Sequence, residues 1–161
     1  MNELANVTDA RINQIALGTM GIFLREHPVP EDENKYKMFV GIYQMCEGMC
    51  KEWEMAEIKV TPSELLEVFS YVVGGGSEVI SDRMGQIANA FMSIKLREKN
   101  RGEVEGVKHV IVKYVCPKPE MTRINALPEE LFAAYMRIRV KILRHEKNQP
   151  LSVGSSNRSE S

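Results

Sequence analysis

Apolar residues recur every three or four positions along most of the chain, a spacing that places them on one face of an α-helix. Five such segments are predicted as helices, over residues 9–27, 31–53, 61–73, 77–100 and 128–147. The most regular apolar stripes lie in the second and fourth segments and consist of Phe39, Ile42, Cys46, Met49 and Trp53, and of Ile80, Met84, Ile87, Phe91 and Ile94. Sustained steps of this kind are typical of helices packed in a bundle or coiled coil.

The helix boundaries carry local signals as well. Thr61, Pro62 and Glu64 combine a capping threonine, a proline at the first helical position and a glutamate three residues after the cap. Three consecutive glycines, residues 74–76, then predict the end of that helix, and Ser77 is the expected cap of the next one. The sequence therefore separates these two helices at the glycine turn.

Residues 109–115 break the helical period. They read His-Val-Ile-Val-Lys-Tyr-Val, which is rich in β-branched and aromatic residues and predicts one short strand or half of a hairpin. A lone strand exposes unpaired backbone groups, so its partner could come from a second copy of the chain. The predicted fold is mainly α, a single-domain bundle of about five helices with a strand or hairpin between the fourth and fifth. We expect a helical domain over residues 1–148 and a polar, flexible tail over 149–161.

Composition narrows the class of protein. The chain has 161 residues, 43% of them hydrophobic and 27% charged, in the range of an ordinary globular domain. Three cysteines cannot form a disulfide framework, which favours a reducing compartment. The N-terminal residues do not resemble a signal peptide, and no apolar run is long enough for a membrane span. We therefore expect a cytoplasmic protein that does not enter the membrane.

The small net charge of −1 hides an uneven distribution. Residues 1–75 hold 12 acidic and 6 basic side chains, whereas residues 76–161 hold 10 acidic and 15 basic ones. The basic residues that could form a nucleic-acid-binding surface are Lys95, Arg97, Lys99, Arg101, Arg137, Arg139, Lys141, Arg144 and Lys147. Two other interpretations stay open: cations near helix C-termini complement the helix dipole, and the acidic half could dock on the basic half.

A metal site is the second chemical hypothesis. Cys46 and Cys50 lie four residues apart on one predicted helix, and with His109 and Cys116 they could supply a Cys3His zinc site. The alternative is that the cysteines are core residues, since structural zinc cysteines usually lie in tight turns. A metal-binding protein is therefore only an alternative to the main hypothesis, which includes no metal.

Two features offer weaker hints. Gly74–Ser77 could present backbone amides to an anion, although the segment follows a helix rather than a strand and a hinge is the alternative interpretation. Gly18 and Gly21 weaken the first helix but allow a neighbouring segment to approach it closely.

Catalytic motifs are absent from the sequence. The most plausible acid and base pair, Glu54 and Glu57, has the spacing of two ordinary surface carboxylates on a helix. The ten methionines suit either an adaptable binding surface or the filling of core gaps.

The main functional hypothesis is a small non-catalytic binding protein, a regulator, adaptor or assembly component, that acts through protein contacts as a homo-oligomer without a cofactor. The side chains expected at its interface are Phe39, Met49, Trp53, Val110, Val112 and Tyr114. A nucleic-acid-binding protein that uses the basic second half is the first alternative.

Overall fold

The computed structural model describes residues 7–26, 35–99 and 108–148, and within these ranges the chain forms eight helical segments. The segments are α1 (Asp9–Glu26), α2 (Lys35–Met49), α3 (Trp53–Glu57), α4 (Pro62–Val73), α5 (Asp82–Lys99), η2 (Ile111–Val115), α7 (Pro119–Arg123) and α8 (Pro128–Lys147). The predicted helical class is confirmed, whereas the number of about five helices is wrong. The predicted tail, residues 149–161, lies outside the described residues.

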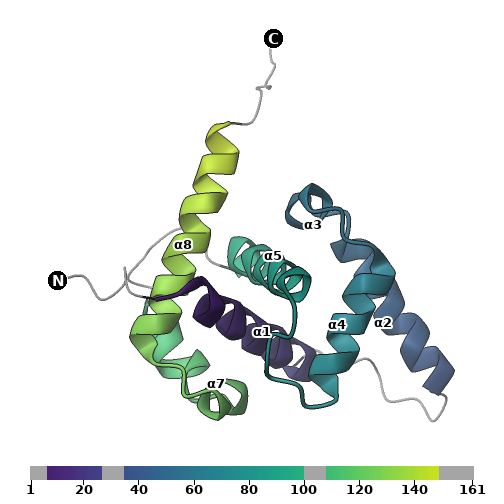
Figure 1. Ribbon diagram of the computed structural model, residues 1–161, viewed down its shortest axis with the longest axis horizontal. Coiled ribbons are helices and arrows are strands. Elements are labelled where there is room, and N and C mark those ends of the chain that lie inside the picture. Colours follow the sequence, from purple (N-terminus) through teal and green to yellow (C-terminus); the bar gives the residue numbers. More distant parts are fainter. Residues whose placement is uncertain (1–6, 27–34, 100–107, 149–161) are drawn as a thin grey trace.

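α1 and α5 pack against each other at the centre of the molecule (Figure 1). On one side α4 packs on α1, and α2 packs on α4. On the other side α8 contacts both central helices, while α7 packs on α1 and η2 on α8. α3 covers part of α5. The central pair is thus covered by helices on two sides.

The apolar stripe of α5 faces this core within one chain. Met84, Ile87, Phe91 and Ile94 are buried, and the Phe91 ring meets Phe23 of α1 with its centroid at 5.3 Å. A second edge-to-face contact, at 5.8 Å, joins Phe91 to Phe69 of α4. The stripe that is typical of a bundle or coiled coil is therefore covered by α1 and α4 of the same chain.

The capping box at the start of α4 is confirmed. The Glu64 backbone N–H donates to Thr61 Oγ1 at 3.2 Å, and the Thr61 N–H donates to Glu64 Oε1 at 3.1 Å. The predicted cap of the next helix is wrong, because α5 begins at Asp82 and the Ser81 hydroxyl accepts from the Met84 N–H at 3.1 Å. Ser77 lies in the connection that precedes it, and Ile80 is 66% exposed.

The strand predicted over residues 109–115 is helical in the structure. Residues 108–110 are α-helical, and η2 continues as a π-helix in which the Cys116 N–H donates to the Ile111 carbonyl, five residues back, at 2.9 Å. Ile111 is buried and Val115 packs at the edge of the core, so tertiary packing overrides the β preference of the side chains. No strand occurs among the described residues, and the argument for pairing with a second copy is lost.

Two short helices were not predicted. The segment expected to be one helix up to Trp53 ends at Met49, and Trp53 begins the separate helix α3. Pro119 occupies the start of α7, in the first turn, where proline is tolerated.

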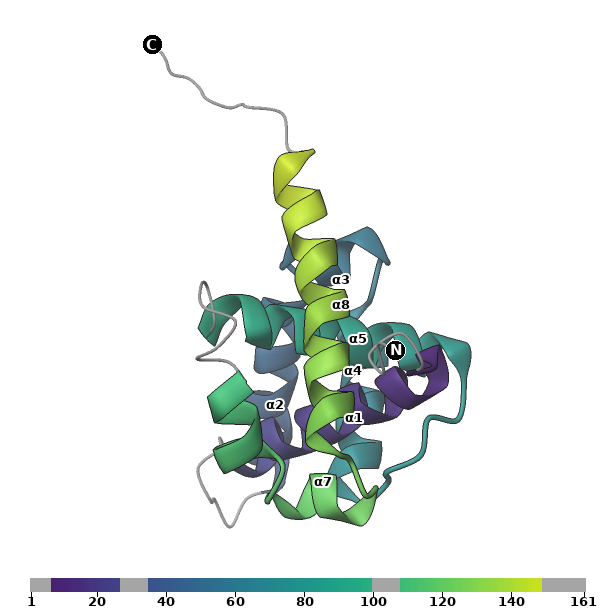
Figure 2. The same ribbon diagram turned by 90° about the vertical axis from the view of Figure 1, so that its left-hand side faces the viewer.

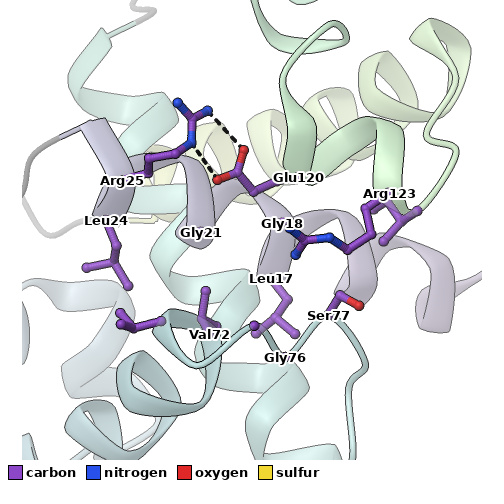
Figure 3. Close-up of a pocket in the computed structure, with 13 residues that line it drawn as sticks. Leu17, Gly18, Gly21, Leu24, Arg25, Val72, Gly76, Ser77, Glu120 and Arg123 are labelled. Atoms are coloured by element: carbon purple, nitrogen blue, oxygen red, sulfur yellow. Dashed lines mark hydrogen bonds and ion pairs between the residues drawn. The ribbon is translucent and has the colours of Figure 1, made fainter.

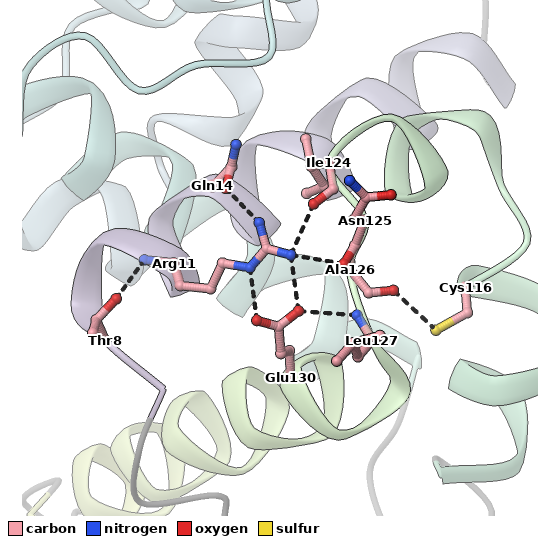
Figure 4. A network of polar contacts seen from close by, with 9 residues as sticks. All are labelled: Thr8, Arg11, Gln14, Cys116, Ile124, Asn125, Ala126, Leu127 and Glu130. Carbon is pink, nitrogen blue, oxygen red and sulfur yellow. Dashed lines mark hydrogen bonds and ion pairs between the residues drawn. The ribbon is translucent and has the colours of Figure 1, made fainter.

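A network around Arg11 joins α1 to the start of α8 (Figure 4). The Arg11 guanidinium binds both carboxylate oxygens of Glu130 on α8 at 2.8 Å, and it donates to the carbonyls of Ile124 and Asn125 at 2.8 and 2.9 Å. Glu130 also accepts from the Leu127 N–H at the start of α8. The hydrogen bonds from Arg11 hold the pKa of the Glu130 carboxyl below its usual value. This network fixes the position of α8 on α1.

None of the helices in the described ranges is both long and apolar enough to cross a membrane.

Candidate functional site

α8 carries most of the predicted cations, and its last turns extend past the other helices in two perpendicular views (Figures 1 and 2). One face of this helix is buried against the body through Leu131, Tyr135, Ile138 and Ile142, which follow steps of three and four residues. The opposite face points to solvent along the second half of the helix. This solvent face is the candidate site.

The His145 side chain attaches the end of α8 to the body. The His145 ring stacks on the indole of Trp53 in α3, with 3.6 Å between ring centroids and an interplanar angle of 3°. Trp53 was predicted at a protein interface, but here it supports α8 within the same chain. The stacking fixes which face of the helix remains exposed.

The exposed face combines cations with apolar side chains. Lys141, Arg144 and Lys147 are exposed and form no hydrogen bond or ion pair with any side chain that the structure describes. Beside them, Val140 is 48% and Leu143 is 49% exposed. Residues spaced by three, four and seven lie on one helical face, so the apolar pair and the cations form one continuous surface. We call these five residues the α8 surface.

The remaining predicted cations on α8 are engaged within the chain. Arg137 donates to Asp9 Oδ1 at 2.6 Å and to the Val7 carbonyl at 2.8 Å. Arg139 donates to the Tyr135 hydroxyl at 3.3 Å. Arg137 therefore joins α8 to the start of α1, whereas the hydrogen bond of Arg139 lies within α8.

The predicted cations of α5 are neutralised in the fold. Arg97 binds Glu54 through Nε–Oε2 at 2.8 Å and Nη2–Oε1 at 3.0 Å, and Nη2 also reaches Glu52 Oε1 at 2.6 Å. These carboxylates, Glu54 first, raise the pKa of the guanidinium. Lys95 pairs with Glu98 at 3.2 Å and lies over the Phe23 ring. The side chain of Lys99 and all of Arg101 lie outside the described residues.

The predicted interface residues are separated in the structure. Met49 is buried in the core, and the Phe39 side chain lies outside the described part of the chain. Val110, Val112 and Tyr114 are 38%, 49% and 53% exposed on and beside η2. These three stay a predicted contact surface, now on a helix instead of a strand edge.

The proposed zinc ligands do not assemble. Cys46 is buried, and burial raises the pKa of its thiol to about 12. Burial also raises the thiol pKa values of Cys50 and Cys116. Among the residues that the structure describes, no three His, Cys, Asp or Glu side chains could hold one metal ion, His109 included. The alternative interpretation, that the cysteines are core residues, is correct for Cys46.

The carboxylates with shifted pKa values are held in their charged form. Arg83 and the Thr61 N–H lower the pKa of Glu64 to about 2, and Arg25 lowers that of Glu120. A general acid or base at neutral pH needs the opposite shift for a carboxyl group. Glu54 is fully buried on Arg97 and Glu57 is exposed, so these two do not form the acid and base pair considered from their spacing.

Comparisons with models of protein families, with curated proteins and with solved structures found no significant match to this chain.

Proposed function

We propose that the chain is a non-catalytic binding protein whose α8 surface binds an acidic groove on a partner protein. The observation that carries this proposal is the group of three cations, Lys141, Arg144 and Lys147, that have no partner among the described side chains and lie beside Val140 and Leu143. Exposed apolar side chains next to polar and charged ones are the usual anatomy of a protein interface. A helix with such a face binds in a groove whose base is apolar.

The charge of the α8 surface limits what can bind there. Two copies of α8 facing each other would bring like charges together, which disfavours self-association through this helix. A nucleic acid would use the cations but gain little from Val140 and Leu143. Its phosphates would also find Arg97 and Lys95 of α5 already paired with carboxylates. An acidic protein partner uses all five side chains.

Site-specific photo-crosslinking tests the proposal in cells that express the chain. A photoreactive amino acid at position 140 or 143 is expected to give a discrete crosslinked protein. The matched control is position 73, where Val73 of α4 is also an exposed apolar residue, 65% exposed. The triple variant Lys141→Glu, Arg144→Glu, Lys147→Glu should abolish the product while its circular dichroism stays that of the parent.

Three results would contradict the proposal. The first is a crosslink at position 73 identical to that at 140 and 143, which would indicate nonspecific contact. The second is a product that survives the triple charge reversal, and the third is a product that is nucleic acid and disappears after nuclease treatment. The last outcome would favour the nucleic-acid alternative, whose affinity should fall steeply with salt.

A further inference from the structure

A cavity of about 290 Å³ lies between α1, α7 and the glycine turn after α4 (Figure 3). This volume is close to the lower limit of small-molecule sites in proteins. Its apolar wall combines residues from all three elements, namely Leu17 and Leu24 of α1, Val72 of α4 and Ile124 after α7. The cavity therefore has the size and the lining for a small apolar group.

Two glycines of α1 let the walls of the cavity come close. A Cβ atom at Gly18 would lie 3.2 Å from Met121 Cε, and one at Gly21 would lie 3.1 Å from Glu120 Cγ. The close approach inferred from the sequence for these glycines is thus made by α7. Opposite α1, Gly75 (φ +99°) and Gly76 form the turn that the sequence suggested as an anion cradle, and both line the cavity.

The polar groups at the cavity are unequally satisfied. Arg25 and Glu120 neutralise each other through two hydrogen bonds, Nε–Oε2 at 2.8 Å and Nη2–Oε1 at 3.0 Å. Arg123, by contrast, extends from α7 toward Gly18 and Ser77, and its guanidinium forms no hydrogen bond or ion pair within the described residues (Figure 3). The Ser77 hydroxyl also has no hydrogen bond there. The charge left at the opening is positive.

We propose that this cavity is a binding site for a small organic carboxylate with a compact apolar body. The apolar part fills the space between Leu17, Val72 and Ile124, while the carboxylate accepts hydrogen bonds from Arg123 and the Ser77 hydroxyl. A guanidinium matches the geometry of a carboxylate with two parallel hydrogen bonds, which sets the orientation of the ligand. The site is independent of the α8 surface.

Titration of the full chain with hexanoate, followed by amide NMR signals, tests this proposal. The expected result is saturable shifts of the Gly18, Gly21, Gly76 and Ser77 amides with a dissociation constant of about 1–10 mM, as suits a ligand of this size. Hexan-1-ol, which has the same chain without the charge, should bind at least about tenfold more weakly. Inorganic phosphate, which has charge without an apolar body, should also bind more weakly than hexanoate.

Substitutions at the opening separate the site from nonspecific binding. Arg123→Gln should weaken hexanoate at least about tenfold, Arg123→Lys should weaken it less, and Lys147→Gln on α8 should leave it unchanged. Equal binding of hexanoate and hexan-1-ol, or of hexanoate and phosphate, would overturn the proposal. So would the absence of saturable shifts, or hexanoate binding that is insensitive to Arg123→Gln.

Discussion

Replacing Arg97 by methionine tests the buried ion pair that joins α3 to α5. The Glu54 side chain is 0% exposed, and its two oxygens accept from Arg97 at 2.8 and 3.0 Å. The only other hydrogen bond to this carboxylate from a described residue is the Ser93 hydroxyl at 3.4 Å. Arg97→Met leaves the Glu54 carboxylate buried in nearly the same surroundings but without its counter-ion.

The expected cost is large compared with the stability of a domain. Removing one partner of a buried ion pair costs about 3–5 kcal/mol, because the remaining charge is desolvated and unpaired. Domains of ordinary size unfold at about 5–15 kcal/mol. With a urea dependence of about 2 kcal/mol per molar, the unfolding midpoint of Arg97→Met should fall by about 1.5–2.5 M.

Urea unfolding measured by far-UV circular dichroism and by tryptophan fluorescence provides the assay. Trp53 is the single tryptophan and directly precedes Glu54, so its fluorescence reports on this region while dichroism reports on all helices. The matched control is Arg144→Met, which removes an exposed cation without a described ion-pair partner and should change stability by no more than about 0.5 kcal/mol.

A double variant distinguishes the lost pair from lost packing. In Glu54→Met with Arg97→Met no buried charge remains, and two apolar side chains fill the space, so most of the lost stability should return. The reasoning is refuted if Arg97→Met unfolds within about 0.5 kcal/mol of the parent, or if the double variant is no more stable than Arg97→Met alone.

Three further predictions follow from local features. The pKa of Glu64 in the folded protein, about 2, lies below its usual 4.5, so Glu64 contributes stability above pH 4.5 that is lost as pH falls toward 2. Urea unfolding at a series of acid pH values should therefore show a flatter dependence of stability on pH for Glu64→Gln than for the parent. An unchanged slope would contradict the role of Arg83. Gly48 in α2 has no atom within 4 Å of an added Cβ, so Gly48→Ala should stabilise by about 1 kcal/mol and raise Tm by about 2–4 °C in calorimetry, whereas Gly85→Ala, whose Cβ would lie 2.5 Å from Asn13 Nδ2, should lower it. With its thiol pKa near 12, Cys46 should resist alkylation at about pH 8 until the chain is unfolded, as mass spectrometry of the labelled peptides can show; rapid labelling of the folded protein would argue against its burial.

Helix boundaries were predictable where the signal is local. The start of α4 at Thr61 was correct because the cap, the proline and the glutamate act within four residues of one another. At the start of α5 two serines compete, and the sequence cannot show that Ser81 rather than Ser77 caps the helix, because the choice depends on how Tyr71 and the glycine turn are placed. The Tyr71 hydroxyl donates to the Glu78 carbonyl at 2.9 Å and fixes the residues in between as a connection.

The segment 109–115 shows the limit of residue preferences. Its β-branched and aromatic side chains favour a strand on average, but the preference is weak compared with burial. In the helix Ile111 and Val115 are four residues apart and both pack on the core, and the Cys116 N–H donates to the Ile111 carbonyl. The spacing of apolar residues within the segment carries no information about α8, which supplies the surface against which η2 packs.

The long-range ion pairs were the least predictable part of the structure. Arg97 was grouped with exposed cations because its sequence neighbours are basic, yet its partners are Glu52 and Glu54, more than forty positions away. The pairing of Arg11 with Glu130 spans 119 positions. Neither ion pair can be inferred from the spacing of neighbouring residues in the sequence. The sequence therefore placed the cations on the last helix but could not tell which cations the fold would neutralise.

The charge asymmetry of the chain can now be separated into two parts. Arg97 with Glu52 and Glu54, Arg137 with Asp9, and Lys118 with Glu26 all join the basic half to the acidic half. The helix dipole explains cations in the last turn of α8, such as Arg144 and Lys147, but its effect fades beyond that turn. Lys141 lies nearly two turns before the end of α8 and has no ion-pair partner among the described residues, so neither explanation accounts for it. Lys141→Glu alone should therefore weaken partner binding while leaving the stability of α8 nearly unchanged, which makes it the most discriminating single substitution on the α8 surface.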